Sequence, residues 1–98
     1  MRPNKTDAVS PKAVSELVEV FSGPNCGYCD RAKALLDRKG VAFTDLDISQ
    51  PENREAFMRR LPRSKAVPQI FIGGEHVGGC EDLEILNDDG TLDKLLGR

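Results

Sequence analysis

The spacing of hydrophobic and polar positions changes from segment to segment along the chain. Residues 17–21 form a short β-branched and aromatic run that stops at turn residues, which predicts a strand. Residues 27–39 carry apolar side chains at helical spacing and predict a helix, with Asn25 as N-cap and Gly40 as C′ residue. The apolar stripe of this helix is Cys29, Ala32, Leu35 and Leu36. Residues 41–48 alternate apolar and polar positions, which is typical of a half-buried strand.

The middle of the chain predicts a helix followed by a hairpin. Ser49-Gln50-Pro51-Glu52 has the form of a capping box with proline in the first turn. The helix that it opens carries Phe57, Met58 and Leu61. A basic loop is expected over residues 59–65. Residues 69–72 predict a strand, 73–74 a glycine turn and 76–77 the second arm of the hairpin.

The end of the chain predicts two helices. The first is expected to start near Glu81-Asp82, with Leu83 and Leu86 facing inward, and Thr91 is expected to cap the second. The order of elements is therefore βαβα–ββα(α). A βαβ start favours parallel pairing and the hairpin adds an antiparallel pair. The pattern predicts an α/β fold with a four-stranded mixed sheet flanked by helices.

Composition narrows the class of protein. The 98 residues suit one domain, and 14 basic against 16 acidic residues leave a net charge of −2, which offers nucleic acid or an anionic membrane no attraction. No apolar run is long enough to span a bilayer. Residues 1–14 hold two prolines and scattered charges and are interpreted as a flexible extension or a cloning remnant, with the folded domain at 15–98. Three cysteines, an odd number, favour a reducing cytoplasm over a disulfide-stapled secreted domain.

Two of those cysteines form the motif Cys26-Gly27-Tyr28-Cys29 at the predicted strand-to-helix junction. A sulfur at a helix N-terminus faces unpaired N–H groups and the positive end of the dipole, so the pKa of Cys26 should fall below about 8.5. The thiolate is the nucleophile of disulfide exchange, and Cys29 is placed to resolve a mixed disulfide on Cys26. A zinc half-site and an inert disulfide are the alternatives. Zinc needs four ligands, and only His76 and Cys80 remain.

Two further segments carry weaker signals. Pro68 directly precedes a strand. One explanation is that it begins an edge strand, where a proline is tolerated. The alternative is a cis Val67–Pro68 bond, which would turn the Val67 backbone outward to pair with an extended peptide. Gly78 and Gly79 precede a helix N-terminus, where free N–H groups hold a carboxylate. The acidic residues that follow suit a ligand ammonium or simply favour the helix start.

Taken together, three motifs make residues 20–95 resemble the glutaredoxins, especially the small bacterial dithiol members. They are Cys26-Gly27-Tyr28-Cys29 followed by Arg31-Ala32-Lys33, then Val67-Pro68-Gln69-Ile70-Phe71-Ile72, and then Gly78-Gly79-Cys80-Glu81-Asp82-Leu83. The resemblance implies the thioredoxin fold and a cis Val67–Pro68 bond. It also implies a groove in which glutathione lies along Val67, flanked by Tyr28. The γ-glutamyl end would lie at Gly79, Cys80, Glu81 and Asp82.

The chain departs from the family pattern at three positions. Gly27 replaces the usual proline. In this family the members without that proline look like the ones that can hold an iron–sulfur cluster between two subunits. Ala66 replaces the usual threonine, and Gly23 replaces a lysine that would face the glycine carboxylate of glutathione. The basic cluster Arg59, Arg60, Arg63 and Lys65 either supplies that charge or forms a solvated face. The solvated face is favoured for all but one of the four.

The resemblance supports one reading over two rivals. It implies a glutathione-dependent thiol–disulfide oxidoreductase that reduces protein–glutathione mixed disulfides and protein disulfides, with Cys26 attacking and Cys29 resolving. The alternative is a homodimeric [2Fe–2S] carrier with Cys26 and glutathione as ligands, whereas the enzyme itself would be a monomer without metal. A redoxin served by thioredoxin reductase would not need the segment 78–82. Cys80 is expected to be a non-catalytic thiol, and His76 an ordinary surface residue.

Overall fold

The computed structural model describes residues 17–97, so the extension expected at residues 1–14 lies outside the described part. The strands are β1 (Val18–Ser22), β2 (Thr44–Asp47), β3 (Gln69–Ile72) and β4 (Glu75–Gly78). The helices are α2 (Gly27–Arg38), α3 (Pro51–Arg60), α4 (Cys80–Asp88) and α5 (Thr91–Leu95). The strands form a sheet in the order β2-β1-β3-β4, in which β1 pairs parallel with β2 and antiparallel with β3, and β3 pairs antiparallel with β4. The predicted mixed sheet is confirmed.

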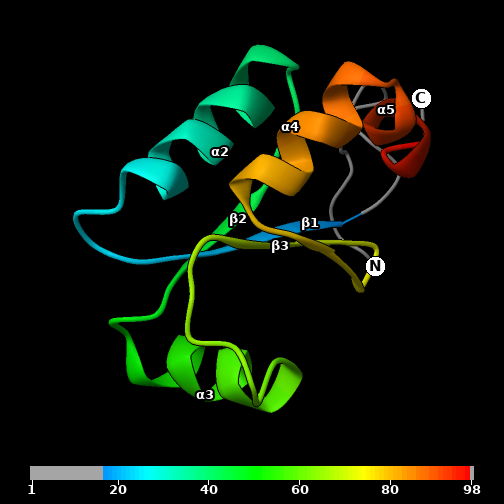
Figure 1. Cartoon of the computed structure of the whole chain (residues 1–98). Helices are drawn as coiled ribbons and strands as arrows, with labels where there is room; N and C mark the ends of the chain where they lie inside the picture. Colours follow the sequence, from blue (N-terminus) through cyan, green and yellow to red (C-terminus); the bar gives the residue numbers. More distant parts are fainter. Residues whose placement is uncertain (1–16, 98) are drawn as a thin grey trace.

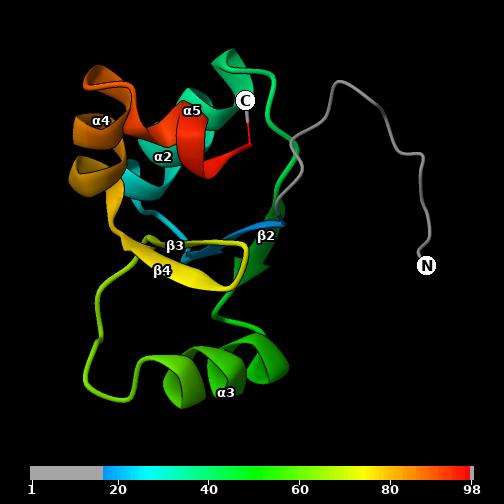
Figure 2. The ribbon, with the colours of Figure 1, turned by 90° about the vertical axis from the view of Figure 1, so that its right-hand side faces the viewer.

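Helices cover both faces of this sheet. Helices α2, α4 and α5 lie on one face and α3 lies alone on the other (Figures 1 and 2). The central strand β1 serves both sides because successive side chains of a strand point to opposite faces: Val20 joins the core under the three helices, whereas Phe21 joins the core under α3. On the α3 side the ring of Phe21 packs edge-on against Phe57, with 5.3 Å between centroids, and against Phe71 at 5.9 Å.

The end of α2 forms a Schellman motif that also shortens the next strand. Gly40 has a φ of +70°, and its N–H donates to the carbonyl of Asp37 while the N–H of Val41 donates to the carbonyl of Leu36. The prediction of Gly40 as the C′ residue is confirmed. Because Val41 is engaged with the helix, the strand predicted over 41–48 is only Thr44–Asp47.

Three predicted caps are wrong. Asn25 adopts a left-handed φ of +54°, so the extended residue before α2 is Cys26, which is the actual N-cap. At α3 the N-cap is Gln50, without a side-chain cap bond, and the backbone N–H of Ser49 donates to Asp47 instead; Pro51 does occupy the first turn. At α5 the N-cap is Gly90, and Thr91 is the first helical residue. In each case the N-cap lies one residue away from the predicted position.

The basic loop is also shorter than predicted. Arg59 and Arg60 are the last residues of α3. Arg59 pairs with Glu55 within that helix, and Arg60 pairs with Glu19 of β1 at 2.8 Å. The guanidinium of Arg60 lies 5.0 Å from the ring centroid of Phe71, so it covers the aromatic core. Both arginines therefore belong to α3 rather than to a loop, and Arg60 packs this helix against the sheet.

Candidate active site

Cys26 lies at the junction of β1 and α2, where its sulfur caps the helix. Its backbone is extended, and its Sγ accepts a hydrogen bond from the backbone N–H of Cys29 at 3.2 Å. The sulfur therefore occupies the position where a helix presents unpaired N–H groups and the positive end of its dipole. Cys26 is half-buried, whereas Cys29 is only 1% exposed. The expected contrast between an accessible and a covered sulfur is present.

The two sulfurs are paired. Cys26 and Cys29 form a disulfide across one helical turn, with 5.2 Å between their Cα atoms. The same Cys26 sulfur lies 3.7 Å from the carbonyl oxygen of Val67. The fold thus brings the motif in α2 next to a residue 41 positions later in the chain, and the expected cis peptide between Val67 and Pro68 is present at this contact.

An open groove of about 490 Å³ adjoins this pair. Three segments line it: the start of α2, the chain before and at the start of β3, and the passage from β4 into α4. Every residue predicted to bind glutathione lies along it, namely Tyr28, Val67, Pro68, Gly79, Cys80, Glu81 and Asp82. Four further residues outside that predicted set also line the groove: Ala66, Gln69, His76 and Gly78.

The wall formed by the start of α4 is built closely around two glycines. The backbone N–H of Gly79 donates to a carboxylate oxygen of Asp82 at 3.0 Å, which caps the helix. Gly78 has a φ of +125°, and a side chain there would collide with Asp82. A Cβ atom on Gly79 would lie 3.4 Å from the carbonyl oxygen of Pro68. The backbone of the two facing segments therefore comes close together here because no side chains intervene.

Cys80 contributes its backbone to the groove more than its sulfur. The residue is 3% exposed. Burial, and then the carboxylate of Glu84, raise the pKa of the Cys80 thiol. A buried thiol with a raised pKa is a poor nucleophile, which agrees with the expectation that Cys80 is non-catalytic.

A polar network around Gln69 forms part of the groove lining. The amide nitrogen of Gln69 donates to Ser64 and to the carbonyl of Ala66, and its oxygen lies 2.7 Å from Nε2 of His76. His76 is exposed, as expected, and its ring lies against that of Phe71. The signal that could have linked Gln69 and His76 is their place on two paired strands.

Gly23, which stands where the family often has a lysine, lies close to Val67. A Cβ on Gly23 would lie 3.4 Å from Cγ2 of Val67, so this loop passes directly beside the groove. Of the basic cluster, Arg59 and Arg60 are engaged by acidic residues of α3 and β1. Lys65 is exposed and directly precedes the lining residue Ala66.

The described residues offer neither a metal cluster nor a membrane span. Over residues 17–97, no three His, Cys, Asp or Glu side chains gather so as to hold a metal ion. Within the same range, no helix has the length and apolar character needed to cross a bilayer.

Comparison with known proteins gives one consistent result. The family model described as Glutaredoxin matches residues 18–77. Glutaredoxin 3 of Escherichia coli strain K12 is 49% identical over 80 residues, covering 81% of this chain and 95% of its own. Glutaredoxin 1 of Rickettsia typhi is 44% identical over 87 residues, covering 87% and 84%.

Solved structures agree in fold. The solution structure of glutaredoxin from Brucella melitensis superposes with a TM-score of 0.71 and 49% identity, over 89% of this chain and 94% of that one. The crystal structure of a buckwheat glutaredoxin–glutathione complex superposes with a TM-score of 0.72 and 33% identity, over 85% and 78%.

Proposed function

Because this chain belongs to the glutaredoxin family of glutathione-dependent thiol oxidoreductases, we propose that it reduces protein–glutathione mixed disulfides and protein disulfides. The observation that carries the proposal is the position of Cys26. Its sulfur caps α2 and at the same time lies beside Val67 at the rim of the groove. A nucleophile is therefore held where a bound glutathione would present its sulfur.

With a mixed disulfide, the reaction needs only Cys26. The Cys26 thiolate attacks the glutathione sulfur, the disulfide to the protein breaks, and the protein leaves as a thiolate that takes up a proton. A second glutathione then attacks the Cys26–glutathione disulfide as its thiolate. Glutathione disulfide leaves and Cys26 returns to the thiolate, so two glutathione electrons have reduced one disulfide.

With a protein disulfide, Cys29 completes the reaction. Cys26 attacks one substrate sulfur and forms an intermolecular disulfide. The Cys29 thiolate, one turn along α2, then attacks Cys26 and releases the substrate as a dithiol. The product on the protein is the Cys26–Cys29 disulfide that the structure contains. Burial of Cys29 supports its role as the second sulfur, because an incoming substrate reaches Cys26 first.

The groove offers complementary groups along the length of glutathione. The backbone of Val67 would pair with the peptide, and the N-terminus of α4 at Gly79 and Cys80 would receive the γ-glutamyl carboxylate. Glu81 and Asp82 would accept the ammonium group, and Tyr28 would flank the sulfur. Lys65 is our candidate for the glycine carboxylate, since it is exposed and directly precedes the lining residue Ala66.

The test is turnover of a small glutathione mixed disulfide, with glutathione and glutathione reductase as the electron supply. Wild type should turn over and Cys26→Ser should be inactive. A folded wild type with free thiols and no turnover would contradict the proposal. Turnover with thioredoxin reductase in place of glutathione would identify a redoxin instead. We place the activity in the cytoplasm, where a reducing glutathione pool regenerates Cys26.

A second candidate function is a homodimer that carries a glutathione-ligated [2Fe–2S] cluster. One observation favours it. A Cβ atom on Gly27 would meet no atom within 4 Å, so the space next to Cys26 is open. As the resemblance to the family implies, the cluster thiolates would be Cys26 and glutathione from each of two copies.

The carrier is tested by anaerobic cluster reconstitution with glutathione present. A brown chromophore that elutes with a dimer and disappears in Cys26→Ala would support this function. A colourless monomer under the same conditions would contradict it and leave the oxidoreductase reading untouched.

A further inference from the structure

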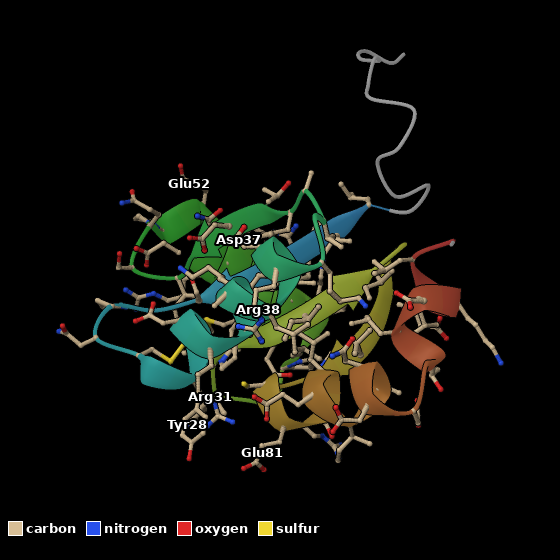
Figure 3. All side chains as sticks on the ribbon, turned by 90° about the horizontal axis from the view of Figure 1, so that it is seen from above. Tyr28, Arg31, Asp37, Arg38, Glu52 and Glu81 are labelled. Atoms are coloured by element: carbon tan, nitrogen blue, oxygen red, sulfur yellow. A yellow bond between two sulfur atoms is a disulfide. The ribbon has the colours of Figure 1, made fainter. Side chains whose placement is uncertain are left out.

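Tyr28 lines the groove, and the cationic side chain of Arg31 packs against its ring. Tyr28 is the second residue of α2 and is 53% exposed. The guanidinium carbon of Arg31 lies 5.3 Å from the centroid of its ring. The two residues are three positions apart, so they share one face of the helix. Figure 3 shows both side chains projecting together from the start of α2.

Arg31 is itself fixed from a second helix. One terminal nitrogen of its guanidinium donates to both carboxylate oxygens of Glu84, at 2.8 and 2.7 Å. The hydrogen bond and the charge of Arg31 hold the pKa of the Glu84 carboxyl below its usual value, so the pair stays ionised in neutral solution. Glu84 belongs to α4, one turn beyond Cys80, whose thiol lies 3.7 Å from the same carboxylate.

The contacts of Arg31 with Tyr28 and Glu84 connect α2 with α4, which contribute two different walls of the groove. Tyr28 belongs to one wall, and Cys80 with its neighbours forms the other. The Arg31 side chain is 54% exposed. Such an exposed ion pair contributes little to stability. A contribution to the stability of the fold therefore does not explain why Arg31 is held in this position. A guanidinium stacked on an aromatic ring, by contrast, restricts the orientations available to that ring.

We propose that Arg31, anchored by Glu84, is a positioning residue that holds the Tyr28 ring at the wall of the glutathione groove. The inference rests on the proposed function, since it assigns a task in glutathione recognition. Arg31 touches no substrate in this role. It limits the motion of the ring that flanks the glutathione sulfur, and so lowers the ordering cost that glutathione binding would otherwise carry.

The sequence supplies a site-specific probe. It contains one tyrosine and no tryptophan, so all intrinsic tyrosine emission comes from Tyr28. Emission anisotropy and acrylamide quenching of the oxidised protein therefore report on this ring alone. The variants are Arg31→Gln, the charge exchange Arg31→Glu with Glu84→Arg, and Lys39→Gln as the matched control. Lys39 pairs with Asp93 at 2.9 Å, beyond the other end of α2.

In Arg31→Gln we expect lower anisotropy, faster quenching and a KM for the glutathione mixed disulfide raised about two- to fivefold, with kcat retained. The charge exchange restores an ion pair between α2 and α4 but places no cation on the ring. It should therefore keep the wild-type Tm and still show the mobile ring and the raised KM. Lys39→Gln should match wild type in both measurements.

Two results would overturn the inference. One is an Arg31→Gln protein with wild-type anisotropy, quenching and KM. The other is full recovery of KM and anisotropy in the charge exchange, which would show that the interhelical ion pair alone matters. If wild type fails to turn over glutathione substrates, the proposed function fails, and the Tyr28 emission still decides whether Arg31 holds the ring.

Discussion

The sulfur of Cys26 accepts a hydrogen bond from the backbone N–H of Cys29 at 3.2 Å. Serine, threonine, aspartate and asparagine usually occupy such a cap, because their oxygens satisfy an N–H that the helix cannot. Here the group that caps the helix is also the proposed nucleophile. In the reduced protein we expect the same N–H to face the Cys26 sulfur and to favour its thiolate. Helix formation and nucleophile activation thus use one contact.

The two cysteines should separate by substrate. Cys29→Ser should retain most turnover of a small glutathione mixed disulfide, because that reaction needs only Cys26. Reduction of a protein disulfide should fall by at least about tenfold, since an intramolecular attack is replaced by a bimolecular one. Parallel assays with both substrates measure the difference. Equal loss on both, or no loss on the protein disulfide, would contradict the resolving role of Cys29.

Gly27→Pro should be tolerated by the fold. Gly27 is the first residue of α2, where proline is favoured, and Cys26 before it has the extended backbone that a following proline requires. A Cβ here meets no atom within 4 Å. We expect the free energy of unfolding to rise by about 0.4–1 kcal/mol, with oxidoreductase turnover retained. Denaturant titration measures the first and the coupled assay the second.

The same variant addresses the cluster. If the open space at Gly27 accommodates a cluster, the Gly27→Pro protein should no longer develop the brown chromophore on reconstitution but should keep its oxidoreductase turnover. An equally brown Gly27→Pro protein would show that this position does not govern cluster binding.

The two glycines of the groove wall should respond differently to alanine. Gly78→Ala should lose about 1–3 kcal/mol of stability, because its φ of +125° and the contact with Asp82 both exclude a side chain. Gly79→Ala should change stability by less than about 0.5 kcal/mol. Its methyl group would instead lie against the carbonyl of Pro68 inside the groove and raise KM for glutathione substrates. Thermal melts with steady-state kinetics test the contrast; unchanged KM in Gly79→Ala would place glutathione elsewhere.

Acid should weaken the fold through Asp45. Burial, the largest influence, raises the pKa of Asp45, but hydrogen bonds from Ser22 and Lys33 outweigh it and the net pKa is lowered. A depressed pKa in the folded state contributes stability above the unfolded pKa of about 3.9, and this contribution is lost as pH falls through the folded value. Asp45→Asn should therefore cost up to about 1 kcal/mol at pH 7, because the side chain is 43% exposed and solvent weakens these interactions. The cost should become progressively smaller below pH 4. Urea titrations of wild type and Asp45→Asn at pH 7 and below pH 4 measure the difference in unfolding free energy. A difference that does not shrink in acid would contradict the linkage.

Lys65→Gln should weaken glutathione recognition. If Lys65 faces the glycine carboxylate in place of the residue missing at Gly23, its removal should raise KM about two- to fivefold and leave kcat unchanged. The matched control is Arg59→Gln, because Arg59 is an equally basic neighbour engaged with Glu55 of its own helix. Added salt should reduce the difference between wild type and Lys65→Gln. An equal effect of both variants would indicate a diffuse surface charge.

Local sequence determined those features whose physics is local. Helical periodicity placed α2, and the alternation of apolar and polar positions placed β2 within residues 41–48. The positive φ that glycine tolerates placed the end of α2 at Gly40, and the missing N–H of Pro51 placed this proline in the first turn of α3. The Cys26–Cys29 spacing, at the junction of a strand and a helix, predicted an attacking and a resolving cysteine one helical turn apart, and in the structure the two sulfurs are paired. Each of these rests on interactions between residues a few positions apart.

Tertiary structure decided what depends on distant segments. The groove joins α2, the chain before β3 and the start of α4, and the sulfur of Cys26 meets Val67 across 41 positions. The links of Arg31 to Glu84 and of Gln69 to His76 likewise have no periodic signal. Such contacts depend on how the sheet and helices pack, because only packing brings side chains from separate elements within hydrogen-bonding distance.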